Sequence, residues 1–305
     1  MSKGKLVPTA PVVFGEILFD VFPDGTEVPG GAPFNVAWHL HHFGCRPLMI
    51  SRVGRDERGK QVLARMRDVG MDTRGIQIDD HHPTGVVQVT FVEGQPQFDI
   101  APNAAYDFID WPAMNDLLAS ISGRLLLAHG TLAIRSPVTL NAFSRLIEVF
   151  YPPVFVDVNL RAPWWDEETV KRVLREARWV KLNADELRQV VPNVGDLLSA
   201  AQYLVEKHKL DTVIVTEGEQ GATVCRADGE TANEAALRLD RFVDSVGAGD
   251  AFCAVMVAGL LMGWPMGSLA LTRAIHFAAE ICQTKGATNA PPELYQRLKQ
   301  EWQLS

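Results

Sequence analysis

Residues 244–250 and the apolar run that follows them to Met262 have the residue types needed to handle a phosphate group. Gly247 and Gly249 carry no Cβ atom, so the backbone there can approach an anion closely. They stand where the apolar run predicts the start of a helix, whose free N–H groups attract anions. Asp250 would repel a phosphate, but it fits as the group that takes a proton from a nucleophile attacking that phosphate. Asp250 would equally serve as a helix N-cap, and this segment alone does not separate the two interpretations.

The elements that must position these residues alternate between short apolar strands and helical patterns, which predicts an α/β fold. Nearly all-apolar strands indicate a parallel sheet covered by helices on both faces. Strands are expected at 12–14 continuing through 18–22, and at 48–51, 124–128, 154–158, 179–182 and 212–216, with a β pair at 222–225 and 237–239. Helices are expected at 33–43, 56–69, 111–121, from Ser136 onward, and at 167–177, 195–208, from Asp250 onward, 267–283 and 292–302. A hairpin at 86–92 and 97–100 fits this sheet poorly, so it is predicted to form a small lid.

Polar residues follow several of the expected strands, at the ends where ligands bind in sheets of this type. Each has a local explanation: Asn183 as an N-cap with Glu186 as its capping-box partner, Asn159 closing a turn, and 216–221 as a hairpin loop. Taken together with residues 247–250, they describe one ridge of loops suited to nucleotide phosphates and a metal ion. The residues at these ends are Asp20, Asn159, Arg161, Asn183, Glu186, Thr216 and Gly218.

Composition excludes several classes of function. The net charge of -8 and the absence of a basic run argue against nucleic-acid binding. Four scattered cysteines without a CxxC pair indicate a reduced, cytoplasmic protein with no zinc site. The first ten residues contain no signal-peptide core, and the apolar run 251–263 is too short to cross a membrane.

Other common site motifs are missing or have a plain explanation. The sequence contains no GxxxxGK[ST], which argues against a P-loop nucleotidase, and no GxGxxG follows the first strand. His39, His41 and His42 lie on an expected helix without a nearby metal-ligand pattern, so we interpret them as surface or hydrogen-bonded polar residues.

Two motifs in distant parts of the chain match one known family. The first is Gly-Gly-Ala-Pro-Phe-Asn-Val-Ala at 30–37, continued at 43–44 and 53–59. The second is Asp-Ser-Val-Gly-Ala-Gly-Asp-Ala-Phe at 244–252, with Ser245 where the family usually has threonine. With these motifs, residues 12–291 resemble the ribokinase/PfkB carbohydrate kinases, in the fructokinase-like branch. The resemblance implies one domain over 1–305, a ribokinase-like three-layer α/β sandwich with a mostly parallel sheet and a β lid from about 17–30 and 84–101.

The resemblance also implies an activity, which is ATP-dependent phosphorylation of the primary hydroxyl of a small sugar, foremost D-fructose to fructose 6-phosphate. ATP would be the co-substrate with Mg²⁺, and K⁺ is a further expectation because many members bind a monovalent cation. Asp250 matches the family's catalytic base. Gly247, Ala248 and Gly249 match its anion hole, and Arg161 matches an arginine that reaches towards sugar and phosphate. Sugar contacts fall on Asp20, Gly31, Asn35, Asn159 and Arg161; nucleotide contacts on Thr216, Gly218, Gly221, Gly247, Gly249, Gly286 and Asn289; magnesium, through water, on Asn183 and Glu186; the monovalent cation on Asp244 and Ser245.

Other substrates and one non-catalytic function stay open at this point. A kinase of 2-keto-3-deoxygluconate or of a nucleoside would use the same chemistry. The aromatic residues Phe34 and Trp38 keep a nucleoside open, because they could stack on its base. A sugar or nucleotide sensor on the same scaffold would have no need of Asp250. The expected partner is a small sugar, with no nucleic acid and no membrane. A homodimer through the lid is a further prediction, based on an expected exposed face with Val87, Val89 and Phe91.

Overall fold

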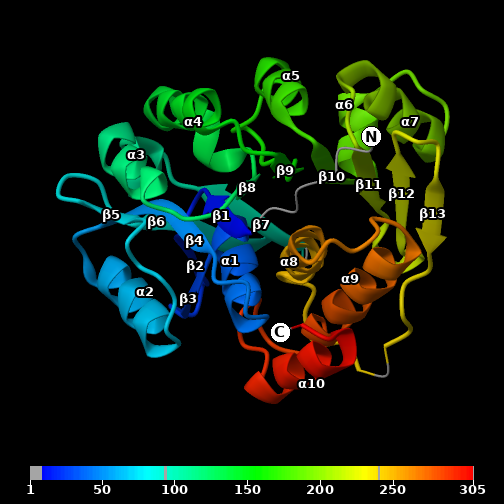
Figure 1. Ribbon diagram of the computed structural model, residues 1–305. Coiled ribbons are helices and arrows are strands. Elements are labelled where there is room, and N and C mark those ends of the chain that lie inside the picture. Colours follow the sequence, from blue (N-terminus) through cyan, green and yellow to red (C-terminus); the bar gives the residue numbers. More distant parts are fainter. Residues whose placement is uncertain (1–8, 93–94, 240, 305) are drawn as a thin grey trace.

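The computed structural model describes residues 9–92, 95–239 and 241–304. In this part of the chain, nine strands form one sheet in the order β13-β12-β11-β10-β9-β8-β1-β4-β5 (Figure 1). Every pairing from β11 to β5 is parallel, and β12 runs antiparallel to both of its neighbours. The predicted mostly parallel central sheet is therefore confirmed. The strands are β1 (Ala10–Phe14), β4 (Leu48–Gly54), β5 (Ile76–Asp79), β8 (Leu125–His129), β9 (Val154–Asp157), β10 (Trp179–Asn183), β11 (Thr212–Thr216), β12 (Ala222–Arg226) and β13 (Thr231–Glu234).

Helices cover both faces of this sheet, giving the expected three layers (Figure 1). Successive side chains of a strand point to opposite faces, so Val13 of β1 joins one apolar core while Val12 and Phe14 join the other. One layer contains α1 (Ala32–His42), α2 (Glu57–Asp68), α8 (Ala248–Leu261), α9 (Ser268–Ile281) and α10 (Pro292–Trp302). The other contains α3 (Trp111–Ala119), α4 (Pro137–Phe150), α5 (Glu167–Glu176), α6 (Ala184–Val190) and α7 (Leu197–His208).

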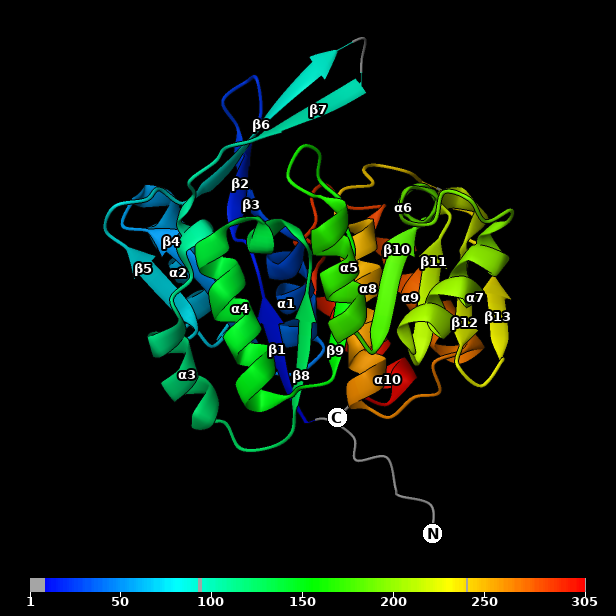
Figure 2. The same cartoon turned by 90° about the horizontal axis from the view of Figure 1, so that it is seen from above.

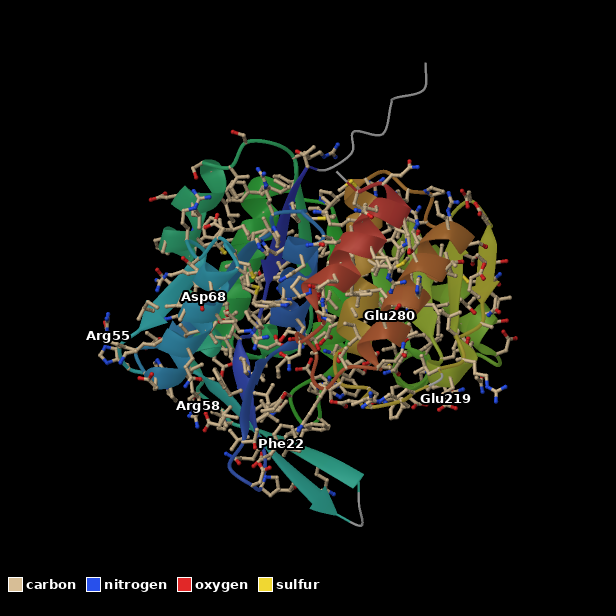
Figure 3. The ribbon with its side chains drawn as sticks, turned by 90° about the horizontal axis from the view of Figure 1, so that it is seen from below. Phe22, Arg55, Arg58, Asp68, Glu219 and Glu280 are labelled. Atoms are coloured by element: carbon tan, nitrogen blue, oxygen red, sulfur yellow. The ribbon has the colours of Figure 1, made fainter. Side chains whose placement is uncertain are left out.

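A second sheet of four strands has the order β3-β2-β6-β7 and stands out from the body at the edge where β1 ends (Figure 2). Its strands, β2 (Leu18–Val21), β3 (Glu27–Gly30), β6 (Gly85–Val92) and β7 (Gln95–Ile100), fall within the ranges expected for the lid. Leu18, Val87 and Ile100 pack with Tyr106 and Leu132 of the body, which anchors this sheet. Figure 3 shows Phe22, just after β2, at the foot of the projecting β6–β7 hairpin.

The apolar stretch from 12 to 22, read as a single strand, is in fact two strands in two different sheets. The chain breaks at Gly15, where a Cβ atom would lie 2.4 Å from Cγ of Pro33 in α1. Sequence spacing could not reveal this contact, because Pro33 is eighteen positions away along the chain.

Two other expectations about strands are wrong. The second strand of the late β pair is β13 at Thr231–Glu234 rather than 237–239, because the chain reverses at Gly229, whose φ is 84°. The edge strand β5 at Ile76–Asp79 was not predicted.

The expected exposed apolar face of the lid is wrong for Val87 and Val89, while the side chain of Phe91 lies outside the described residues. Val87 and Val89 are 4% and 3% exposed, since this face of β6 packs inward. Glu93 and Gly94, which the sequence places in the hairpin, lie outside the described residues, as do residues 1–8. Among the described residues, no helix is long and apolar enough to cross a membrane.

Candidate active site

The start of α8 is built around a left-handed glycine. Gly247 is the N-cap residue, with φ 81° and ψ -2°, and Asp250 is the third residue of the helix. The N-cap interpretation of Asp250 is therefore wrong, because its side chain makes no capping hydrogen bond and instead accepts one from Asn35. No side-chain cap engages this first turn, and the Ala248 N–H donates to the carbonyl oxygen of Ser245 at 3.2 Å. Asp250, partly buried, faces α1 with its carboxylate held in place.

The left-handed turn is fixed by the packing of a second loop against it. A Cβ atom on Gly247 would lie 2.2 Å from Cβ of Ala287, so only glycine fits. Asp244 bridges the same two loops: its Oδ1 accepts from the Val246 N–H at 3.0 Å and its Oδ2 from the Gly286 N–H at 3.4 Å. The predicted anion hole and the loop with Gly286, a predicted nucleotide contact, are thus joined, and Ser245 beside them is exposed.

Asn35 is the partner that orients Asp250. Its Nδ2 donates to Asp250 Oδ2 at 2.7 Å, while its Oδ1 is buried without a partner among the described residues. Asn35 is held in the first turn of α1, which begins after Gly31 at φ 106°. A Cβ on Gly31 would lie 2.6 Å from the carbonyl oxygen of Glu16, so this glycine allows the two segments to touch. An orphaned buried oxygen next to Asp250 is a natural place for a ligand hydroxyl.

Burial raises the pKa of three carboxyl groups at this site. Burial raises the pKa of Asp250 to about 6, against the lowering hydrogen bond from Asn35, with Asp157 raising it further and Lys181 and Arg161 lowering it. Burial likewise raises the pKa of Asp20 to about 6 and that of Glu16 to about 7. Arg161 lowers all three pKa values and Asp250 raises the other two, so the protonation of each group depends on the charges of the others.

Arg161 is exposed. Among the described residues, its guanidinium donates one hydrogen bond, to the carbonyl oxygen of Leu160 at 3.5 Å. The turn before it is held firmly: Asn159 has φ 41°, and the Leu160 N–H donates to Glu186 Oε1 at 2.8 Å. The arginine therefore projects from a fixed backbone and is free to meet an anionic ligand.

Asn183 and Glu186 form the capping box that the spacing predicts. Asn183 Oδ1 accepts from the Glu186 N–H, and Glu186 Oε2 accepts from the Asn183 N–H, both at 2.8 Å. Glu186 is buried, and burial followed by the charge of Asp157 raises its pKa. Both oxygens of Glu186 already accept a backbone hydrogen bond, so any metal ion held here would be contacted through water. No cluster of three His, Cys, Asp or Glu side chains suited to a metal occurs in the described chain.

The predicted nucleotide residues lie in two turns. Thr216 ends β11, and Gly218 opens a short 3-10 helix, Gly218–Gln220, in the hairpin to β12, as the local interpretation predicted. Gly221 has a structural reason to be glycine, since a Cβ there would lie 2.0 Å from the carbonyl oxygen of Glu234. Asn289 is exposed at the other turn, with its amide bonded to Arg65 and to the carbonyl of Lys285.

No hydrogen bond or ion pair in the described residues joins Thr216 or Gly218 to Asp250. Figure 3 shows Glu219 of this hairpin on the same side of the molecule as the lid.

Sequence reasoning missed several charged residues of the site. Glu16 and Lys181 are buried at 3% and 6% exposure, and Lys181 pairs with Asp157 at 3.0 Å. The signal for this pair was present, because each residue is a lone charge inside an apolar strand. The three histidines are hydrogen-bonded as interpreted: His39 to Tyr295, His41 to the carbonyl of Val69 and His42 to that of Trp38.

Comparison with known proteins agrees with this geometry. A model of the pfkB family carbohydrate kinases matches residues 20–294. The chain belongs to the pfkB family of carbohydrate kinases. Among its relatives, the chain is 29% identical over 267 residues to a fructokinase of Escherichia coli, covering 82% of this chain and 83% of that protein. It is 28% identical to a putative sugar kinase of Pyrococcus horikoshii, covering 86% and 83%.

Solved structures show the same fold. Fructokinase of Xylella fastidiosa with bound ATP aligns with a TM-score of 0.84 at 21% identity, over 97% of this chain and 100% of that one. Fructokinase of Vibrio cholerae in a form that binds fructose, ADP and calcium aligns with a TM-score of 0.79 at 24% identity, over 95% and 99%. The ribokinase-like architecture expected for this pfkB kinase is therefore confirmed.

Proposed function

We propose that this carbohydrate kinase transfers the γ-phosphoryl group of ATP to the primary hydroxyl of D-fructose, giving fructose 6-phosphate. The observation that carries the proposal is the Asp250 carboxylate, held by Asn35 at 2.7 Å in the first turn of α8. Fructose is chosen because fructokinases recur among the relatives at 26–29% identity and because one neighbour is described with fructose and ADP bound.

The proposed reaction is a single displacement. The sugar oxygen forms a bond to the γ-phosphorus while the bond from that phosphorus to the leaving oxygen breaks, and ADP departs. The hydroxyl proton passes to Asp250 late, because a carboxylate of pKa about 6 is far too weak a base to ionise an alcohol beforehand. A pKa raised to that value still leaves most of Asp250 ionised near pH 7.

Charge stabilisation is assigned to the first turn of α8. Backbone N–H groups of Gly247, Ala248 and Gly249 would hold the equatorial oxygens of the transferring group, since no side-chain cap occupies that turn. The Ala248 N–H donates to the carbonyl oxygen of Ser245 at 3.2 Å and would have to share its hydrogen bond with the phosphoryl group. Arg161 would add a positive charge from a side chain with little other engagement. Together they supply the positioning and charge that phosphoryl transfer requires.

Sugar selection is assigned to Asp20, Gly31, Asn35 and Asn159. The unpartnered Oδ1 of Asn35 and the partly buried carboxylate of Asp20 would accept from sugar hydroxyls. A Cβ on Gly30 would lie 3.4 Å from Asp20 Oδ2, which places this lid carboxylate against the end of β3, two residues before α1 begins. The four-stranded sheet would close over the sugar and exclude water.

ATP would be bound by the turns with Thr216, Gly218 and Gly221 and with Gly286 and Asn289. Magnesium, when bound with ATP, would neutralise phosphate charge, held through water by Asn183 and Glu186, whose oxygens already accept backbone bonds. We also propose a K⁺ ion near Asp244 and Ser245, a homodimer through the lid sheet and a cytoplasmic location. These stay predictions.

A panel of sugars with ATP and Mg²⁺, read by ADP release, tests the proposal. Turnover with fructose well above turnover with 2-keto-3-deoxygluconate, nucleosides and other sugars is expected. The Asp250→Asn variant should keep sugar binding by calorimetry while kcat falls by about 10²–10⁴-fold, the usual contribution of a general base. Preference for another substrate would refute fructose, binding without turnover in the unmodified protein would favour a sensor, and near-normal turnover of the variant would refute the assigned base.

A further inference from the structure

A buried ion pair lies beside the first turn of α8 and has no part in the proposed proton transfer. Lys181 Nζ donates to Asp157 Oδ1 at 3.0 Å, and the two residues are directly paired in the register of β9 and β10. The other oxygen, Asp157 Oδ2, accepts from the thiol of Cys253 at 3.3 Å. All three side chains are buried, so both charges are fixed in position.

The pair has a defined direction along α8. A Cβ atom on Gly249 would lie 3.5 Å from Lys181 Nζ, which places the ammonium directly against the last glycine of the proposed anion hole. Cys253, which holds the carboxylate, comes four residues later and therefore about one turn further into the helix. The positive end of the pair lies at the helix start and the negative end one turn deeper, in the same sense as the helix dipole.

Packing alone gives no reason for a lysine at this place. A buried ion pair stabilises a fold no better than a neutral pair of similar size, because two charges must be stripped of water. Burial would lower the pKa of Lys181, but the carboxylate of Asp157 raises it above the ordinary value, so the ammonium stays charged. A permanent positive charge is therefore maintained next to Gly249, with Glu186 and Asp250 as its further charged neighbours.

We propose that Lys181 is a positioning residue for phosphoryl transfer: held by Asp157, its ammonium fixes a positive charge beneath Gly249 and stabilises negative charge that develops on the transferring group. The inference rests on the proposed function, in which Gly247 to Gly249 hold that group. A preorganised charge in a water-poor site acts more strongly than one in water and needs no rearrangement during the reaction. Its effect should appear in kcat and not in the KM for sugar.

The test replaces both charges together. Lys181→Gln with Asp157→Asn keeps a hydrogen-bonding pair and leaves no unpaired buried charge, whereas Lys181→Gln alone would strand Asp157. Lys181→Met with Asp157→Asn is the second choice should the amide pair not pack. The matched control is Arg178→Gln with Asp211→Asn, an ion pair of 2.6 Å at the opposite end of β10 that is about one-third exposed. Thermal unfolding confirms that each variant is folded.

We expect kcat of the folded Lys181–Asp157 variant to fall by about tenfold to a hundredfold, less than the roughly 10²–10³-fold loss for a direct oxyanion donor. The KM for sugar should stay within about twofold, and the control should match the unmodified protein. Measurement at about pH 8.5, well above the pKa of about 6 of Asp250, removes protonation of the base as a cause. Asp157 raises and Lys181 lowers that pKa, so the acid limb of the pH profile should move little.

Two results would overturn the inference. One is an unchanged kcat in the folded double variant. The other is equal loss in Lys181→Arg, which keeps the charge and should retain more activity than the neutral pair. Absence of sugar phosphorylation by the unmodified protein refutes the proposed function itself. An active protein that is inactivated by Asp250→Asn but not by loss of the ion pair refutes only the role of Lys181.

Discussion

Asn35 controls the protonation of Asp250, and removing its amide gives a sharp test of the proposed base. In the structure, Asn35 Nδ2 donates to Asp250 Oδ2 at 2.7 Å and so favours the ionised carboxylate. Burial and Asp157 act in the opposite direction, while Lys181 and Arg161 assist Asn35, and the resulting pKa is about 6. Asn35→Leu is close in size and removes only the donor and the neighbouring acceptor.

The magnitude follows from the strength of that bond. A hydrogen bond to a charged group is worth roughly 1.5–3 kcal/mol, and one pKa unit corresponds to about 1.36 kcal/mol, so the pKa should rise by about 1–2 units. At pH 7 the ionised fraction of Asp250 would fall from about nine-tenths to between about one-half and one-tenth. Activity needs the ionised form, so kcat at pH 7 should fall by about twofold to tenfold and recover near pH 9.

The assay is kcat from ADP release at saturating sugar across the pH range, which separates protonation from weaker sugar binding. Asn233→Leu, which removes an amide bonded to Thr223 at 2.7 Å on the distant β13, is the matched control and should leave the profile unchanged. An acid limb that remains near pH 6 in Asn35→Leu would show that the amide does not tune Asp250. A loss of kcat that does not recover at high pH would refute protonation as the cause.

Two further predictions follow from the same turn. Gly247→Ala should abolish most activity and lower the Tm more than Gly229→Ala does. Both glycines have φ near 80°, but only a Cβ on Gly247 would meet another residue, Cβ of Ala287 at 2.2 Å. Equal losses of Tm in the two variants would contradict this packing. Asp250→Asn should raise the free energy of unfolding by up to about 3 kcal/mol above pH 6, because the raised pKa means that the folded state holds the charged carboxylate unfavourably. That gain should shrink as the pH falls from 6 to below the ordinary pKa of 3.8, where the carboxyl group becomes protonated in the unfolded state as well as in the folded state. A gain constant with pH in thermal unfolding would contradict it.

Local patterns were enough to predict most of the elements. Pro33 near the start of α1 and Gly44 beyond its end mark that helix, and the structure places it at Ala32–His42. The capping box of Asn183 and Glu186 was readable from its spacing alone. What failed depended on contacts between distant segments. Gly15 splits an apolar run because Pro33 of another element occupies the space of a side chain.

The sequence was enough to predict which residues belong to the site, but not the contacts between them. Motifs indicated that Asp250 and Asn35 belong together, but not that a 2.7 Å hydrogen bond joins them across 215 positions. The pairing of Lys181 with Asp157 depends on the register of β9 against β10, which no local pattern in either strand determines. The effects of Arg161 and Asp250 on the pKa values of Asp20 and Glu16 likewise depend on loops that only the folded chain brings together.

The residues that break local rules are concentrated at this site. Asp250 stands where helix capping would favour it but does not cap, Asn35 buries an unpartnered oxygen, and Lys181 interrupts an apolar strand. Buried polar groups without partners and buried charges are unfavourable, so the arrangements at Asn35 and Lys181 lower the stability of the fold. A ligand with hydroxyl and phosphate groups would satisfy the same atoms, so sugar and nucleotide should raise the Tm of the unmodified protein more than that of Asn35→Leu.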